Sequence, residues 1–317
     1  MIRVIALICL SGLAVLAYAG ADNKTAIKFE PIKVSAHAYY VQGMAGAVSV
    51  ENQGFMSNAG FVVTKDGVIV FDTLGTPVLA KQLVAAIAKI TKQPVKRVII
   101  SHYHADHIYG LQVFKALGAE IWAYKAGQEY LESDEARLRL QQRRELLKPW
   151  VDENTHLVAA DKWLDGDTDF AMGGLHFELR YVGPAHSAED MALFVKEDGV
   201  LYSGDLVFKG RVPFVGNADS RKWLQALDKL AAFKPKYMIP GHGTASNTPL
   251  ADLKLTRDYL TYVRQVMGKA VQDFIPFDEA YAQADWSQYS KLPAFLDANR
   301  ANAYNTFLLM EQESINK

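Results

Sequence analysis

Cysteine is almost absent from this sequence, because Cys9 is the single one among 317 residues. Cys9 lies in an N-terminal segment that we expect to be cleaved off, so the predicted mature chain has neither a thiol nor a disulfide. Any metal site in this chain must then be built from nitrogen and oxygen ligands. This excludes the thiolate-rich structural zinc sites.

An excess of charge and a bilayer-length apolar run are missing as well. The 34 Lys and Arg residues nearly balance the 35 Asp and Glu residues, and no long basic run suggests a nucleic-acid-binding surface. Residues 4–16 are apolar but short for a membrane span. With Arg3 before them and Ala17-Tyr18-Ala19 after them, they are typical of a secretory signal peptide.

We therefore predict a signal peptide at residues 1–19, cleavage after Ala19, and a periplasmic or secreted protein without stable membrane insertion. A membrane anchor or a buried helix is the alternative interpretation of residues 4–16.

What the sequence does contain is an alternation of strand-like and helix-like segments. Residues 61–63 and 68–71 are β-branched runs on either side of the turn sequence Lys65-Asp66-Gly67, which predicts a hairpin. Thr76-Pro77 is typical of a helix start, and apolar residues then recur at helical spacing at Leu79, Leu83, Ile87 and Ile90.

The same alternation continues to about residue 248. The pattern predicts strands at residues 97–101, 121–124, 177–182, 191–195, 200–203 and 237–239, and helices at 111–117, at 128–147 and after a Ser220 cap. We expect the charged side of the 128–147 helix to face solvent. Such an alternation predicts a layered α/β domain over residues 20–248, followed by a helical extension over residues 249–317.

Four of the strand-like runs end in side chains that can bind a metal. His102, His104, Asp106 and His107 follow the first run, and the other three runs lead to His186, Asp205 and His242. A single sheet edge would bring these side chains together. The remaining histidines, His37, His156 and His176, are assigned to the surface or the core.

Seven potential ligands are more than one tetrahedral ion can use. Neutral imidazoles and carboxylates suit zinc and also iron. Two ions that share one carboxylate would fit this number, and such pairs lie about 3.5–4 Å apart in hydrolases.

The motif His102-x-His104-x-Asp106-His107 resembles the metallo-β-lactamase superfamily of metal-dependent hydrolases. The other ligands stand in similar contexts: His186 in Gly-Pro-Ala-His, Asp205 in Ser-Gly-Asp and His242 in Pro-Gly-His-Gly. The resemblance spans roughly residues 47–243. It implies a four-layer αββα sandwich with the active site along one edge of the two sheets.

The resemblance also implies a role for each ligand. The first metal would be bound by His102, His104 and His186, and the second by Asp106, His107 and His242, with Asp205 as the bridge. Asp106 would also orient the attacking water or accept its proton. Asp72, at another strand end, would orient a ligand histidine, although it could equally be a turn-forming aspartate.

The segment after Asp205 indicates which branch of the superfamily the chain resembles most. The bridging aspartate resembles glyoxalase II more than the class B β-lactamases, but the Gly-Arg-Thr-Asp-like segment of glyoxalase II is missing. With its export signal, the chain looks most like the periplasmic SoxH-like and quinoprotein-relay metallohydrolases.

This resemblance implies an exported enzyme with two Zn²⁺ per chain, where iron or manganese would also suit the ligands. It would hydrolyse a small carbonyl substrate, such as a lactam, lactone, amide or thioester, with a metal-bridging hydroxide. One alternative is a mononuclear iron oxidoreductase like the persulfide dioxygenases. Another is a metal-binding accessory protein without activity.

Several residues near the motifs are candidates for substrate contacts. Lys209 and Arg211 could bind a substrate carboxylate or could be solvated loop charges. Tyr103 and Tyr109 could donate to an oxyanion, although core packing is the simpler interpretation. An apolar flap or ordinary hairpin packing would account for Met44, Phe55 and Met56. Residues 249–317 would cover the domain or mediate dimer contacts; the sequence leaves the oligomeric state and the physiological substrate open.

Overall fold

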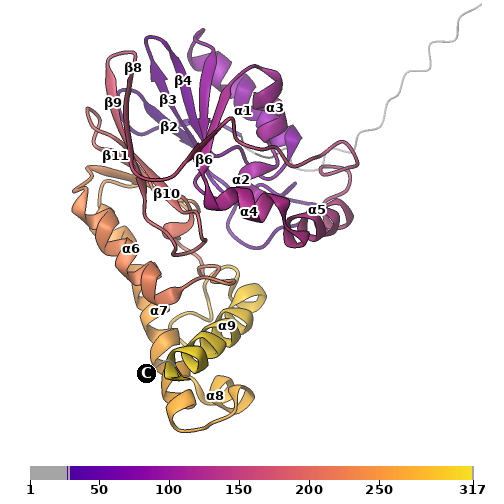
Figure 1. Cartoon of the computed structure of the whole chain (residues 1–317), viewed down its shortest axis with the longest axis vertical. Coiled ribbons are helices and arrows are strands. Elements are labelled where there is room, and N and C mark those ends of the chain that lie inside the picture. Colours follow the sequence, from indigo (N-terminus) through magenta and orange to yellow (C-terminus); the bar gives the residue numbers. More distant parts are fainter. Residues whose placement is uncertain (1–26, 28, 316–317) are drawn as a thin grey trace, which may run out of the picture.

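The computed structural model describes residue 27 and residues 29–315 (Figure 1). The predicted signal peptide, residues 1–19, lies outside these described residues. Within them, two β-sheets pack face to face and helices cover the outer faces, which confirms the α/β sandwich. None of the helices in the described part of the chain has the length and apolar character needed to cross a bilayer.

The first sheet contains seven strands in the described part of the chain, arranged in sequence order. Its first four strands pair antiparallel, and β4 to β7 pair in parallel. The strands are β1 (Ile32–Lys33), β2 (Ala38–Val41), β3 (Ala59–Thr64), β4 (Gly67–Phe71), β5 (Val95–Ile99), β6 (Glu120–Tyr124) and β7 (Lys162–Leu164).

The second sheet contains five strands of the described chain. In spatial order they are β12 (Tyr237–Ile239), β11 (Val200–Tyr202), β10 (Met191–Val195), β9 (Leu175–Tyr181) and β8 (Thr168–Met172). Strand β10 pairs antiparallel with both β9 and β11, and β11 pairs in parallel with β12. The carboxyl ends of β9, β11 and β12 therefore lie at the same edge.

The helices follow the strands in alternation and then continue alone. They are α1 (Pro77–Ile90), α2 (Ala105–Ile108), α3 (Leu111–Ala116), α4 (Ala126–Glu132), α5 (Asp134–Leu146), α6 (Ser220–Ala232), α7 (Pro249–Gln272), α8 (Phe277–Gln283) and α9 (Phe295–Ile315), with a 3₁₀ turn η1 at Gly204–Leu206. The predicted start of α1 is confirmed, because the Thr76 side chain accepts a hydrogen bond from the Leu79 amide and Pro77 is the first helical residue.

The four layers follow from the two faces of each strand. Successive side chains of a strand point to opposite sides, so β4 divides its apolar residues between two clusters. Ile69 and Phe71 pack against the second sheet, whereas Val68 and Val70 pack against the helices of the outer layer. Both faces of β4 are therefore buried, as its continuous apolar sequence predicts.

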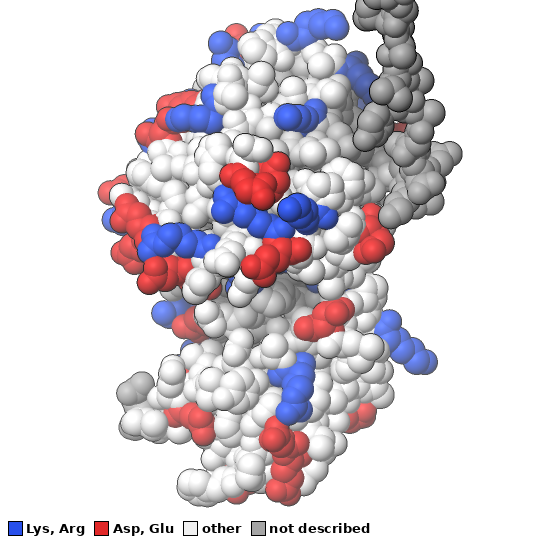
Figure 2. Space-filling view, turned by 90° about the vertical axis from the view of Figure 1, so that its right-hand side faces the viewer, with Lys and Arg blue, Asp and Glu red and all other residues white. Residues whose placement is uncertain are grey.

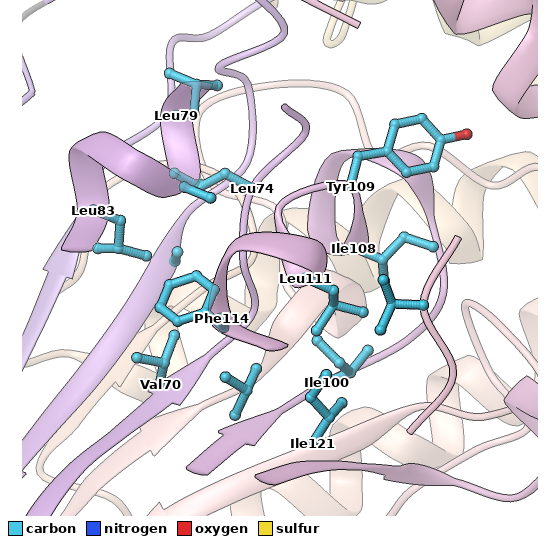
Figure 3. Close-up of a cluster of buried hydrophobic side chains, with 14 of the residues drawn as sticks. Val70, Leu74, Leu79, Leu83, Ile100, Ile108, Tyr109, Leu111, Phe114 and Ile121 are labelled. Carbon is cyan, nitrogen blue, oxygen red and sulfur yellow. The ribbon is translucent and has the colours of Figure 1, made fainter. Parts of the chain in front are cut away.

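The buried apolar residues between the first sheet and helices α1, α2 and α3 form the outer cluster of the first sheet, which includes Ala105 and Ile108 from the segment of the HxHxDH motif. Figure 3 shows Leu79 and Leu83 from α1, Phe114 from α3 and Ile108 from α2 around Val70 of β4, Ile121 of β6 and Ile100, which follows β5. These contacts pack α1, α2 and α3 against the sheet near the carboxyl end of β5. The motif residues therefore belong to a segment that is fixed by buried apolar side chains.

Two local predictions are wrong. The chain between residues 128 and 147 is not one helix, because Ser133 is extended and its side chain caps α5 by accepting a hydrogen bond from the Ala136 amide. The cap of α6 is Asp219 rather than Ser220, because the Asp219 carboxylate accepts hydrogen bonds from the amides of Arg221 and Lys222.

The C-terminal helices share a core with the second sheet. Trp223 of α6, Leu260 and Val263 of α7 and Phe307 of α9 belong to one buried cluster with Leu201 of β11. In Figure 1 these helices extend from the sandwich, with α7 and α9 crossing and α8 at the far end. Helix α9 contacts the segment that follows β11, where Asn302 bonds to Pro213 and Val215.

Candidate metal centre and cavity

The seven side chains of the His/Asp cluster, defined as His102, His104, Asp106, His107, His186, Asp205 and His242, come from two sheets. His102 follows β5 of the first sheet, and the next three residues lie at or within α2. The others follow β9, β11 and β12 of the second sheet. The expectation that a single sheet edge supplies all the ligands is therefore wrong, because both sheets supply ligands from edges that face each other.

The side chains of the cluster converge on a common point. The ligand atoms form two groups, one with His102, His104, His186 and Asp205 and the other with Asp106, His107 and His242, and within each group they lie within 4.8 Å of one another. The Nε2 of His186 lies 3.0 Å from the Nδ1 of His104. Ligands of a tetrahedral zinc ion at 2.0–2.1 Å are separated by roughly 3.3 Å, so this spacing fits a metal.

Asp205 lies between the two groups. One of its oxygens, Oδ1, is 3.1 Å from the Nε2 of His107, and the other, Oδ2, is 3.2 Å from that of His242 and 3.5 Å from that of His186. The carboxylate thus faces histidines that belong to different groups. A single aspartate in this position can contact ligands of two neighbouring ions.

Two glycines allow this close approach of Asp205. A Cβ atom added at Gly241 would collide with Asp205 Oδ1 and would lie 2.6 Å from the carbonyl carbon of Gly204. Gly204 itself has a φ of 52°, in the left-handed region that favours glycine. The Ser-Gly-Asp and Pro-Gly-His sequences therefore have a steric reason as well as a chemical one.

Several buried polar atoms of the cluster have no hydrogen-bond partner in the described part of the chain. They are His102 Nε2, His107 Nε2, His186 Nδ1, Asp106 Oδ2 and Asp205 Oδ1. His186 Nδ1 is on the far side of its ring from the Nε2 that faces His104. Buried polar atoms without partners are rare and cost free energy, so the concentration of the other four at the centre fits the binding of an ion.

Three imidazoles of the cluster favour the neutral form that binds metals. Burial lowers the pKa of His102, that of His104 to about 4 and that of His186 to about 3. Burial alone would also lower the pKa of His107, but the nearby carboxylates, chiefly Asp205, outweigh it and raise that pKa. Metal binding at His107 therefore competes with a proton.

Hydrogen bonds fix which ring nitrogen faces the centre. The Nδ1–H of His107 donates to Asp72 Oδ2 at 2.9 Å, and the Ser101 hydroxyl donates to the same oxygen at 2.7 Å. The Ser101 oxygen can then accept from the Nδ1–H of His102, which is 2.9 Å away. His242 Nδ1 lies 2.7 Å from the Met56 carbonyl oxygen. In all three rings Nε2 is left free for a metal.

A cavity of about 190 Å³ opens onto the His/Asp cluster. Ala47, Val48 and Met56 from the loop before β3 and Phe208 and Phe214 from the loop after η1 form its apolar walls. Arg139 and Arg143 of α5, Arg211, and Asp297 of α9 supply charge. On the face that carries α5 and α9, Figure 2 shows a hollow between the upper part of the molecule and the C-terminal helices.

The predicted substrate contacts have different positions in the structure. Arg211 lines the cavity, but the ammonium group of Lys209 lies 2.7 Å from Asp252 of α7 and does not reach it. Of the predicted flap residues, Met56 lines the cavity, Met44 is exposed elsewhere and Phe55 is buried against Phe29.

The tyrosines and the three other histidines lie away from the cavity. Tyr103 and Tyr109 are buried in the outer cluster of the first sheet and do not line the cavity. His37, His156 and His176 lie outside the His/Asp cluster, at exposed or partly exposed positions.

Sequence reasoning missed the arginines of α5 and the contribution of α9. The i, i+4 spacing of Arg139 and Arg143 indicates a shared helix face but not what that face meets. The link to α9 depends on Asn302, whose side chain accepts from the Val215 amide at 2.9 Å and donates to the Pro213 carbonyl at 2.7 Å. These bonds hold the segment between Arg211 and Gly216 against the C-terminal helices.

A family model for the metallo-β-lactamase superfamily matches residues 52–242. The match includes all seven members of the His/Asp cluster. The chain therefore belongs to the metallo-β-lactamase superfamily, and it is a metal-dependent hydrolase with a His/Asp metal-binding cluster.

Individual relatives agree with this assignment. The metallo-β-lactamase IND-1 of Chryseobacterium indologenes is 25% identical over 230 residues, which cover 71% of this chain and 85% of that protein. A metallo-β-lactamase structure from Pontibacter korlensis matches with a TM-score of 0.57 and 23% identity, covering 74% of this chain and 99% of that one.

A second type of relative extends further along the chain. The structure of the sec-alkylsulfatase Pisa1 from Pseudomonas sp. matches with a TM-score of 0.69 and 18% identity, covering 89% of this chain and 50% of that one. At this identity the similarity concerns the fold alone. A match of this extent reaches into the C-terminal helices, which begin at residue 249.

Proposed function

We propose that this protein is an exported dinuclear zinc hydrolase that cleaves a small carbonyl substrate, such as a lactam, lactone, amide or thioester. The observation that carries the proposal is the position of Asp205, whose oxygens lie 3.1–3.8 Å from the Nε2 atoms of His102, His107, His186 and His242. Export rests on the signal-like residues 1–19, and the SoxH-like branch on the sequence after Asp205.

The residues of the cluster divide into two ligand sets. His102, His104 and His186 would hold one ion, and Asp106, His107 and His242 the other, with Asp205 common to both. Two zinc ions bound there would supply a water of lowered pKa and a Lewis acid for the substrate carbonyl.

The remaining steps belong to residues of the chain. Asp106 lines the cavity, so a carboxylate oxygen that does not bind the ion can orient the attacking water and take its proton. Phe208 stacks on the His242 ring at a centroid distance of 4.8 Å. Together with Met56 it limits the access of bulk water to the ligands.

Elemental analysis combined with a substrate panel tests this proposal. We expect about two zinc ions per chain and hydrolysis of at least one of a chromogenic β-lactam, a lactone, an amide and a thioester. Asp205→Asn should lower the zinc content and reduce turnover by at least about 100-fold, because one side chain serves both sets. One iron per chain with thiol-dependent oxygen uptake would support the dioxygenase alternative instead, and zinc without any turnover would contradict the hydrolase.

A further inference from the structure

The cavity above the His/Asp cluster has a basic wall formed by the α5 arginine pair, defined as Arg139 and Arg143. The two residues are four positions apart, so they lie on the same face of α5, and both line the cavity. Asp106 and Asp205, from the cluster, line the same cavity. The two arginines therefore border the space in which a substrate would lie.

The guanidinium groups of the α5 arginine pair have fewer hydrogen-bond and ion-pair partners than those of Arg137 and Arg144 on the same helix. Arg137 donates to the Asp134 carboxylate and the Glu132 carbonyl, and Arg144 donates to the carbonyls of Asp152, Glu153 and Thr155. The guanidinium of Arg143 has no hydrogen-bond or ion-pair partner among the described residues. The one pairing of Arg139 found there is with Glu135 at 4.0 Å, between side chains that are both more than a third exposed.

An arginine in this state is available to a ligand. Burial lowers the pKa of Arg143, while the Asp106 carboxylate opposes that effect, and Arg143 lines the cavity beside the cluster. A partly buried guanidinium without an acceptor has lost part of its hydration without a compensating hydrogen bond. An oxyanion that enters the cavity can supply that bond, which favours binding. Tyr130 of α4 lines the same wall, and burial raises its pKa to about 12, so its hydroxyl remains a donor at neutral pH.

Arg211, which also lines the cavity, has more side-chain contacts than the α5 arginine pair. Burial lowers its pKa, and the Asp205, Asp106 and Asp297 carboxylates oppose that effect, Asp297 least. Its Nε lies 3.4 Å from the Val212 carbonyl oxygen, and its Nη1 lies 3.4 Å from His242 Nδ1. The negative charges of Asp106 and Asp205 would be balanced by the metals that they bind. Among the described residues, the cavity-lining arginines with the fewest side-chain partners are therefore those of the α5 arginine pair.

We propose that Arg139, Arg143 and Tyr130 form an anion subsite that selects substrates with an oxyanion group at a distance from the bond that is hydrolysed. This inference rests on the proposed function for the reaction, and it adds the substrate class. The apolar walls at Val48, Met56 and Phe214 would hold the uncharged part between the two ends. The shared chemistry is a carboxylate, sulfate or phosphate group on a small apolar body.

Direct binding tests the subsite without requiring turnover. Isothermal titration of the zinc-loaded full chain with hexanoate, hexyl sulfate and hexyl phosphate should show binding of at least one, and the ranking identifies the preferred oxyanion. Hexanol, which has the same apolar body without the charge, should bind at least about tenfold more weakly.

Variants of α5 connect the binding to the arginines. The double variant Arg139→Ala/Arg143→Ala should lose at least about tenfold in affinity for the anions with unchanged zinc content. Arg137→Ala on the same helix is the matched control, because its guanidinium pairs with Asp134 away from the cavity, and it should bind as the wild type does. Arg143→Lys should retain part of the affinity.

Two results would overturn the subsite. Equal anion affinity in the wild type and the double variant would place the anion on the metals alone, and equal binding of hexanol and the anions would remove the charge selection. If anions bind through α5 but no carbonyl compound is hydrolysed, the subsite stands and the proposed reaction fails. With an active enzyme, the double variant should raise KM for a carboxylate-bearing β-lactam by about tenfold, leaving its methyl ester unaffected.

Discussion

The Asp72 Oδ2 atom lies 2.9 Å from the Nδ1 atom of His107, and this pairing turns the other nitrogen of the ring toward Asp205. Asp72 also accepts hydrogen bonds from the amide and the hydroxyl of Ser101. It thereby orients His107 directly and His102 through Ser101. Of the two interpretations of Asp72, the contacts favour the orienting one, although its φ of 63° is also typical of a turn.

Replacement of this aspartate should weaken metal binding without disturbing the backbone. Asparagine tolerates the left-handed conformation, so Asp72→Asn changes the acceptor and not the turn. We expect a 10- to 100-fold loss of zinc affinity, measured by competition with a chromophoric chelator. Ser101→Ala, which interrupts only the connection to His102, should have a smaller effect. Wild-type affinity in Asp72→Asn would show that the ring orientation is set by packing.

Gly241→Ala should disrupt the centre through steric conflict alone. The new methyl group would meet Asp205 Oδ1 and the backbone of Gly204, so the shared carboxylate must move. We expect reduced zinc content by elemental analysis and a loss of turnover of at least about tenfold. Gly166→Ala is the control, because a Cβ there meets no atom within 4 Å among the described residues. Full metal content in Gly241→Ala would contradict the steric argument.

Asn302→Ala should affect the cavity from a distance. The Asn302 side chain is buried and bonds to Pro213, Val215 and Tyr259. Its loss leaves a buried amide and a carbonyl without partners, which should lower the free energy of unfolding by about 1–3 kcal/mol in urea titrations. We also expect an increased KM with unchanged zinc content. Asn305→Ala, which removes one bond to the Gly216 carbonyl, should have a smaller effect on both; equal effects would argue against a special role of Asn302.

Asp198 should make stability depend on pH in the acid range. Burial raises the pKa of this carboxyl, but hydrogen bonds from Ser35 and His37 outweigh it, so the pKa in the folded protein is lowered. The carboxylate therefore stabilises the fold above the usual aspartate pKa near 3.9, and the effect disappears as the pH falls through the lower folded-state value.

The matching experiment compares the wild type with Asp198→Asn in urea at several pH values. We expect the wild type to be more stable by roughly 1–2 kcal/mol at pH 5, with the gap narrowing below about pH 4. Zinc content at neutral pH should be the same in both, because Asp198 is not part of the His/Asp cluster. A gap that persists unchanged to pH 2 would contradict the assignment.

Much of the sandwich follows from local sequence signals. Val68 to Phe71 are apolar on both faces, and such a run suits a strand covered on two sides. The cap at Thr76 and the following proline fix the start of α1 from neighbouring residues. The break at Ser133 was missed, because one capping side chain within a charged stretch has little effect on helical periodicity.

The sequence by itself determined the superfamily and the ligand types, because imidazoles and carboxylates at strand ends are specified by residue identity and spacing. Tertiary structure decided that two sheets supply the facing edges, that Lys209 pairs with Asp252 instead of reaching the cavity, and that Arg139 and Arg143 border it. These outcomes depend on how α5, α7 and α9 dock. The docking is determined by contacts between residues far apart in the chain, which periodicity and motif spacing do not encode.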